Sequence, residues 1–179
     1  MENENEIKQP GMGKVAFQYG LLLALALILL SLVFYLAGDA TNKWAGYLSY
    51  PIIVVFLVYG IIKFRNDINN GAISYGKALG LGTLISLFAG IIYAVYSFVF
   101  YQFIGPEVID EILIKAEETI IMQNPNISTS ELDMALSFTR TFTNPILLSI
   151  GSIFSYTFIG FIFSLIIAIF LKKKPVEEL

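Results

Sequence analysis

The side chains that most often do chemistry at neutral pH are missing from this chain of 179 residues. It contains no histidine and no cysteine, so the commonest general base, the commonest metal ligand and every thiol nucleophile are excluded. Its acidic and basic residues all lie outside four long apolar stretches, whereas a proton relay or an ion path would need them inside. We therefore expect no enzymatic activity, no cofactor and no metal site. The net charge of -3 gives no reason to expect a nucleic acid as a partner.

One regular spacing indicates close packing between helices. In the third apolar stretch a small residue recurs at every fourth position, and the fourth stretch has shorter versions of this strip. Helices in lipid gain stability from close backbone approach, which small residues permit. We expect the strip to pack helices within one chain, with a homodimer interface and a lipid groove or ligand pathway as alternatives. It consists of Ala78, Gly82, Ser86, Gly90 and Ala94, and the shorter versions are Gly151 with Ser155 and Gly160 with Ser164.

Polar side chains are scattered through the apolar stretches, towards the middle and the outer side of the predicted membrane. They have two interpretations. They could line a shallow cavity that opens outwards, or they could form hydrogen bonds between helices, each worth about 0.6 kcal/mol on average. The residues are Ser31, Tyr35, Tyr47, Tyr50, Tyr93, Ser97, Gln102, Asn144, Ser149, Ser152, Ser155 and Tyr156.

The composition indicates that these residues belong to a membrane protein. Hydrophobic residues make up 56% of the chain and charged residues 14%, whereas soluble domains average roughly 45–50% and about 25%. The apolar residues gather in four blocks, each long enough for a helix to cross a hydrocarbon core of about 30 Å. We predict an all-α polytopic membrane protein, with residues 1–179 as a single membrane domain. Its transmembrane helices are expected at residues 15–37, 44–62, 78–104 and 145–171.

The distribution of lysine and arginine predicts the orientation, because basic residues in short loops mark the cytoplasmic side. Residues 1–14, 63–77 and 172–179 hold two, three and three of them, Lys8 and Lys14 being the first two. The remaining loops hold three together. We predict a multi-pass protein of the bacterial inner membrane, with the lipid bilayer as its surroundings and both termini in the cytoplasm. Aromatic residues crowd the outer end of the third span, where we expect them at the headgroup level: Tyr96, Phe98, Phe100, Tyr101 and Phe103.

Residues 105–144 form a long acidic loop between the third and fourth spans, on the predicted outer side. Its apolar residues recur at helical spacing in two segments, which Asn124-Pro125-Asn126 separates. Ser128 and Glu131 fit a capping box at the start of the second segment. We predict an extracytoplasmic helical hairpin whose apolar stripe lies on the membrane or against the bundle. It would serve as a lid or docking surface, or as an amphipathic connector with a solvated acidic face.

Residues 63–77 form a short basic turn on the predicted cytoplasmic side. We expect its structure to depend on Arg65, Asp67, Gly71, Ser74 and Gly76, with Ser74 capping the third helix. The run Arg65-Asn66-Asp67, then Asn70-Gly71, then Ile73 to Ala78, followed by Gly82 and a tyrosine-rich span, resembles the bacterial membrane proteins of domain of unknown function 4199. The resemblance extends from about Tyr19 to Lys173 and includes Asn144-Pro145. It implies four spans with a long helical loop before the last, and it implies no activity.

Three classes of function remain open at this point, of which a membrane enzyme is disfavoured by the missing histidine and cysteine and by the lack of acidic residues inside the spans. The first is a structural or accessory membrane component that acts through protein or lipid contacts, with a homodimer or another membrane protein as the possible partner. The second is a transporter or channel for a neutral or lipidic small molecule, with the polar outer half as its mouth. Transport requires a continuous polar or hydrated path between the helices, so the packing of the bundle discriminates between them.

Overall fold

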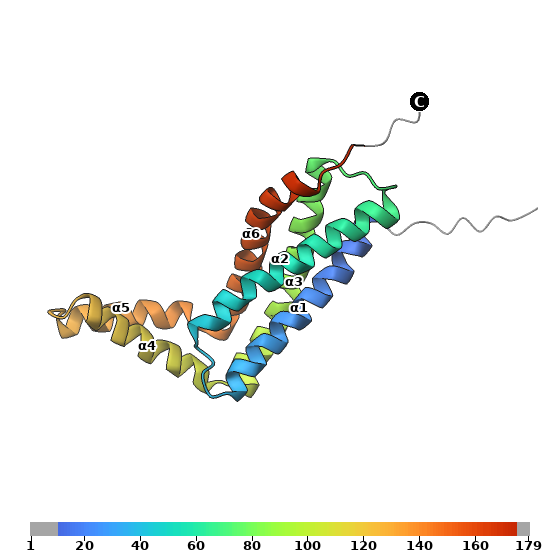
Figure 1. The fold of residues 1–179 in the computed structure, drawn as a ribbon. Coiled ribbons are helices and arrows are strands. Elements are labelled where there is room, and N and C mark those ends of the chain that lie inside the picture. Colours follow the sequence, from blue (N-terminus) through green and yellow to red (C-terminus); the bar gives the residue numbers. More distant parts are fainter. Residues whose placement is uncertain (1–10, 175–179) are drawn as a thin grey trace, which may run out of the picture.

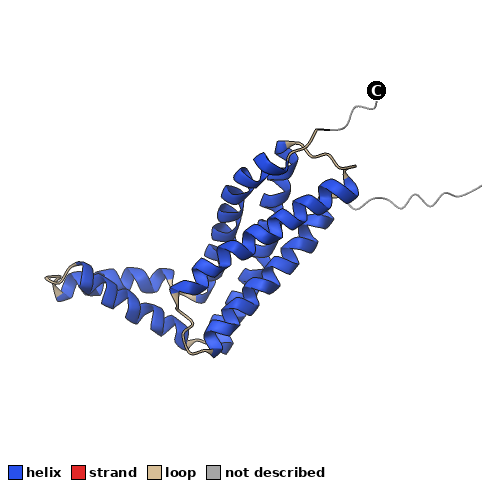
Figure 2. Ribbon diagram, in the orientation of Figure 1, coloured by secondary structure: helices blue, strands red, loops and turns tan. Residues whose placement is uncertain are grey.

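The computed structural model describes residues 11–174, and its regular structure is helical throughout that range (Figure 2). A single isolated bridge between Ile73 and Lys173 is its only extended pairing within the described residues. Lys8, which contributed to the predicted orientation, lies outside the described range.

Four long helices form the bundle, as predicted (Figure 1). Each is long and apolar enough to span a membrane. Two of them end in a π-helical turn, η1 (Phe64–Ile68) after α2 and η2 (Phe100–Ile104) after α3. The four helices are α1 (Met12–Leu36), α2 (Lys43–Lys63), α3 (Tyr75–Val99) and α6 (Pro145–Leu171).

Short polar side chains determine where most of these helices begin. An amide or hydroxyl oxygen at the N-cap accepts a hydrogen bond from a backbone N–H of the first turn, which would otherwise lack a partner. In α6, Pro145 follows its cap at the first helical position, where the missing N–H costs nothing. The caps are Asn42 for α2, Ser74 for α3 and Asn144 for α6.

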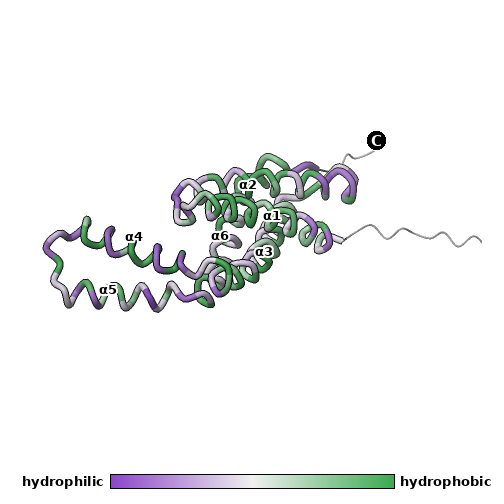
Figure 3. Tube along the Cα trace, turned by 90° about the horizontal axis from the view of Figure 1, so that it is seen from below, coloured by the Kyte–Doolittle hydropathy of each residue, from purple (hydrophilic) through white to green (hydrophobic). Residues whose placement is uncertain are grey.

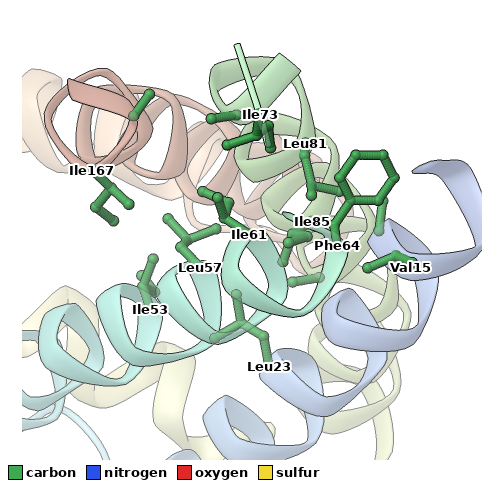
Figure 4. Close-up of a cluster of buried hydrophobic side chains, with 14 of the residues drawn as sticks. Val15, Leu23, Ile53, Leu57, Ile61, Phe64, Ile73, Leu81, Ile85 and Ile167 are labelled. Carbon is green, nitrogen blue, oxygen red and sulfur yellow. The ribbon is translucent and has the colours of Figure 1, made fainter. Parts of the chain in front are cut away.

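Helix α3 lies at the centre of the bundle, because α1, α2 and α6 all pack against it, α6 most extensively. We call the end at which α1 begins and α6 ends the lysine end, and the opposite end the hairpin end. The half of the bundle towards the lysine end has a closely packed apolar core (Figure 4), in which every labelled side chain is at most 8% exposed. These are Val15, Leu23, Ile53, Leu57, Ile61, Phe64, Ile73, Leu81, Ile85 and Ile167.

The helices α4 (Glu107–Gln123) and α5 (Thr129–Phe142) pack against each other and project from the hairpin end (Figure 1). The capping box at the start of α5 is present, with Ser128 and Glu131 bonding each other's backbone N–H groups. The Ser128 hydroxyl also donates to the Glu131 carboxylate. This hydrogen bond is the main reason that the pKa of Glu131 lies below its ordinary value.

Polar contacts from α4 hold the hairpin on the bundle. Glu107 accepts a hydrogen bond of 2.8 Å from the Tyr35 hydroxyl. Lys115, two turns further along α4, lies 3.6 Å from the carboxylate of Asp39 and also donates to Thr41. Residues 107 and 115 therefore share one side of α4, which faces the end of α1 and the loop that follows it. An exposed ion pair adds little stability, so these contacts orient the hairpin more than they stabilise it.

Candidate functional site

The strip of small residues on α3 lies in the interface with α6 of the same chain. Gly82 faces Ser164, and a Cβ atom added at Gly82 would lie 2.9 Å from the Cβ of Ser164. Reciprocally, Gly160 of α6 accommodates Ser86 of α3. Both serines are at most 1% exposed. Because α6 covers the strip, a homodimer would have to use another surface.

The strip is buried along its whole length. Ala78 is completely buried at the lysine end, and Ala94 is 7% exposed towards the hairpin end. A Cβ atom at Gly90 would lie 3.2 Å from the backbone of Ile153, so α3 and α6 still approach closely there. Gly151 and Ser155 depart from the expected packing, since they lie on the wall of a cavity instead. A Cβ atom at Gly151 would meet nothing within 4 Å.

This cavity, which we call the hairpin-side cavity, has a volume of about 690 Å³ and lies between α2, α3, α6 and the end of α5. Pockets that bind small molecules usually measure about 300–1,000 Å³. Its walls are apolar apart from serine and tyrosine hydroxyls, and no charged residue lines it. The lining residues are Gly46, Ser49, Tyr50, Tyr93, Ser97, Tyr101, Phe142, Leu147, Leu148, Ile150, Gly151, Ser152, Phe154, Ser155, Tyr156 and Ile159.

The mouth of the hairpin-side cavity opens on the outer side of the helices. Three of its wall residues, Tyr50, Ile150 and Phe154, are 41%, 45% and 71% exposed. They lie on membrane-spanning helices, where an exposed apolar side chain contacts acyl chains.

A smaller chamber of about 150 Å³ lies next to the cavity and reaches Leu27 and Ser31 of α1. The two spaces share Tyr93, Tyr101 and Tyr156 among their walls. The rings of Tyr93 and Tyr156 are in edge contact, with centroids 4.9 Å apart.

The aromatic residues at the end of the third span were expected at the headgroup level, and the structure places several of them inside the bundle. Phe100 is only 3% exposed, and its ring packs against Tyr35 and Tyr96. Tyr96 donates a hydrogen bond to Ser31 of α1. Phe98 and Phe103, at 38% and 72% exposure, face away from the bundle interior. Tyr96 and Phe100 make their contacts within the bundle, and Tyr101 lines both the chamber and the cavity.

Of the polar residues considered for an outward cavity, six line the hairpin-side cavity: Tyr50, Tyr93, Ser97, Ser152, Ser155 and Tyr156. Others have structural roles. The Ser149 hydroxyl donates to the Pro145 carbonyl at 2.6 Å, and Tyr47 packs on Trp44 at the surface. Sequence reasoning missed Ser49 and Tyr101, because no spacing within one helix shows which residues face a space between helices.

The turn between α2 and α3 fastens the end of α6. Ile73 and Lys173 exchange two backbone hydrogen bonds of 2.9 Å, and Arg65 donates to the Leu171 carbonyl at 3.2 Å. Asp67 pairs with Lys63 one helical turn away. Gly71 adopts a φ of +76°, which favours glycine.

The start of α3 completes this arrangement. The Ser74 hydroxyl caps the helix by accepting from the N–H of Lys77. Gly76 has open space beside it, so its lack of a side chain is not required by packing.

The model of the family described as Protein of unknown function (DUF4199) matches residues 18–173. The chain belongs to the DUF4199 family. No curated protein and no solved structure matches it.

The DUF4199 match extends over all four spans and the hairpin. Within the matched residues, three positions of the Ile73 to Ala78 stretch have clear structural roles. Ile73 is buried and bridges to the end of α6, Ser74 caps α3, and Ala78 is completely buried in the core. In residues 11–174 of this DUF4199 chain, no three acidic side chains gather in a way that could hold a metal ion.

Proposed function

We propose that the protein is an accessory component of the bacterial inner membrane that holds a neutral, lipid-like molecule in its hairpin-side cavity. One observation carries the proposal: the hollow on the hairpin side of the bundle ends on the closely packed apolar core between the helices. The cavity has an uncharged wall and a mouth that faces lipid. Beneath it, Ile53, Leu57 and Ile85 are at most 1% exposed, so the space ends in a packed core. Such a shape suits a receptor better than a conduit, and the proposal assigns no catalysis to the chain.

The proposed orientation places the lysine end in the cytoplasm. Most of the described basic residues lie at that end, as the positive-inside rule requires of cytoplasmic segments: Lys14, Lys63, Arg65, Lys77, Lys172, Lys173 and Lys174. A reporter enzyme that works only outside the cytoplasm should be inactive when fused to the C-terminus. The same reporter inserted after Asn124, between α4 and α5, should be active. The reverse pattern would refute the orientation.

The hairpin would then lie along the outer surface of the bilayer. Figure 3 shows hydrophobic residues along the long helices and mixed colouring along the hairpin. On α5 the exposed large apolar residues recur at every fourth position, and α6 continues the same spacing. The row on α5 supports a lipid contact for this helix, whose last residue, Phe142, lines the cavity. The residues are Met134, Phe138 and Phe142 on α5, then Ile146, Ile150, Phe154, Phe158, Ile162, Ile166 and Phe170 on α6.

Filling the cavity should abolish ligand binding without disturbing the fold. Gly151→Phe places a ring in the cavity from a position where a Cβ atom meets nothing within 4 Å. Wild-type protein purified in gentle detergent should carry a neutral lipid-like molecule, detected by native mass spectrometry. Its occupancy should fall at least about tenfold in the variant, equivalent to about 1.4 kcal/mol.

Gly80→Phe is the matched control, because Gly80 also has open space beside it and does not line the cavity. It should retain the ligand. Equal retention by both variants, or a wild-type protein with no neutral ligand, would contradict the proposed receptor function.

Transport of the same class of molecule is the second candidate. The chamber next to the cavity favours it, since that space extends the hollow towards α1. Transport requires the packed core at the lysine end to open. Transfer of a fluorescent neutral lipid across proteoliposomes, faster than in protein-free vesicles, would support transport over simple binding.

A further inference from the structure

A second pocket, lined by basic residues, lies at the lysine end, between the start of α3 and the end of α6. It has a volume of about 560 Å³. In Figure 1 the dark red end of α6 lies beside the green segment that leads into α3. Four cationic side chains line the pocket. We call it the lysine pocket, and its lining comprises Asn69, Ala72, Ile73, Ser74, Tyr75, Lys77, Lys172, Lys173 and Lys174.

The charges of the lysine pocket lack counterions among the described residues. Neither Lys77 nor any lysine of the 172–174 run forms an ion pair there. No acidic residue lines the pocket, and Asp67, the acidic residue of the adjoining turn, is paired with Lys63 instead. Like charges held around one space repel one another, so the folded protein gains stability when an anion enters.

The protein holds these lysines in place. The two backbone hydrogen bonds between Ile73 and Lys173 bring the lysine run beside the start of α3, and Arg65 secures the last turn of α6 through Leu171. The backbone N–H groups of the first turn of α3 add partial positive charge at the same place. The pocket, the four cations and the fastened chain are three separate features that favour one ligand chemistry.

We propose that the lysine pocket binds the phosphate-bearing headgroup of an anionic phospholipid. The pocket lies where α3 begins and α6 ends, which is the level of the headgroups for helices that span a bilayer. Its wall is partly apolar, through Ala72, Ile73 and Tyr75, which suits the glycerol and first acyl carbons of a lipid better than a free phosphate ion. Basic pockets between transmembrane helices are known to select anionic headgroups in this way.

Thermal unfolding and native mass spectrometry of the full-length, detergent-purified protein test the proposal. Phosphatidylglycerol should raise the melting temperature and remain bound, whereas phosphatidylcholine should not. Replacing Lys77 or Lys173 with glutamine should each weaken phosphatidylglycerol binding about fivefold, the equivalent of about 1 kcal/mol per basic residue. Lys43→Gln, at the hairpin end, should leave binding unchanged.

A second pair of variants separates loss of binding from loss of folding. Ser74→Asp retains a good N-cap for α3 but adds a negative charge to the pocket, so the protein should fold and lose phosphatidylglycerol binding. Ser74→Asn retains the cap without the charge and should bind normally. Undiminished binding by Ser74→Asp, or equal stabilisation by phosphatidylcholine, would overturn the proposal. Stabilisation by inorganic phosphate equal to that by phosphatidylglycerol would overturn its assignment to a lipid.

Discussion

Replacing Gly160 with leucine should force α6 away from α3 and lower the free energy of unfolding by at least about 3 kcal/mol, the upper range for overpacking a filled core. A Cβ atom at this position already overlaps the side chain of Ser86 and lies 3.7 Å from its Cα. Ser86 is 1% exposed and has no free space to enter. The helices must separate, and the close approach that stabilises helix pairs in lipid is lost. Thermal unfolding in a single detergent measures the effect.

Ser164→Ala tests the same interface with a change that should be tolerated. The Ser164 hydroxyl is buried and has no hydrogen-bond partner among the described residues. Its removal therefore leaves no new unpaired group, and stability should change by less than about 1 kcal/mol. Gly82 faces Ser164, so Gly82→Leu should lower the free energy of unfolding about as much as Gly160→Leu does. A Gly160→Leu variant that melts with the wild type would show that the small residues do not determine the α3–α6 packing.

Replacing Gly20 with leucine should disrupt a different interface, between α1 and α3, with a comparable loss of at least about 3 kcal/mol. A Cβ atom at Gly20 would lie 2.8 Å from the carbonyl oxygen of Ile85 and 2.7 Å from the Cβ of Phe88. A backbone oxygen cannot move aside without moving α3 itself. The Ile85 side chain also lies against Gly60 of α2, so displacing α3 should disturb the packing of α2 as well.

Gly13→Leu is the control for this change, because it lies on the same helix and has nothing within 4 Å of an added Cβ atom. We expect Gly13→Leu to purify as a single species with the wild-type melting temperature. Gly20→Leu should melt earlier and elute heterogeneously from a size-exclusion column. If both variants behaved alike, the close approach of α1 to Ile85 would not contribute to stability.

Much of the architecture was predictable because its causes are local. In a bilayer, the backbone N–H and C=O groups of an uncharged apolar run of this length find their hydrogen-bond partners within a helix. The structure has four helices of that kind. The hydrogen bonds that start helices also arise from neighbours in sequence, so Ser74 and the Ser128–Glu131 pair were recognisable. The four-residue spacing of Gly82 and Ser86 likewise identified one face of α3 before its partner was known.

Other features depend on which helices become neighbours. Gly20 and Gly60 are single glycines without a repeating pattern, and their close contacts arise only because α1 and α2 both approach Ile85. Gly151 has the same spacing to Ser155 as Gly160 has to Ser164, yet the first pair lines a cavity and the second packs. Spacing along one helix specifies a face, and it does not specify what lies opposite that face.

The amino-acid sequence alone predicted a helical membrane protein, which contains no histidine or cysteine, and the positions of its acidic loop and basic segments are the basis of the proposed orientation. The packing of the helices established that a cavity lies on the hairpin side of the apolar core, and that three lysines after α6 join Lys77 around one pocket. These two kinds of feature have different physical origins. Apolarity, charge and capping are properties of a segment and its solvent, whereas a cavity or a cluster of charges arises from residues far apart in sequence whose separation is set by the packing between helices.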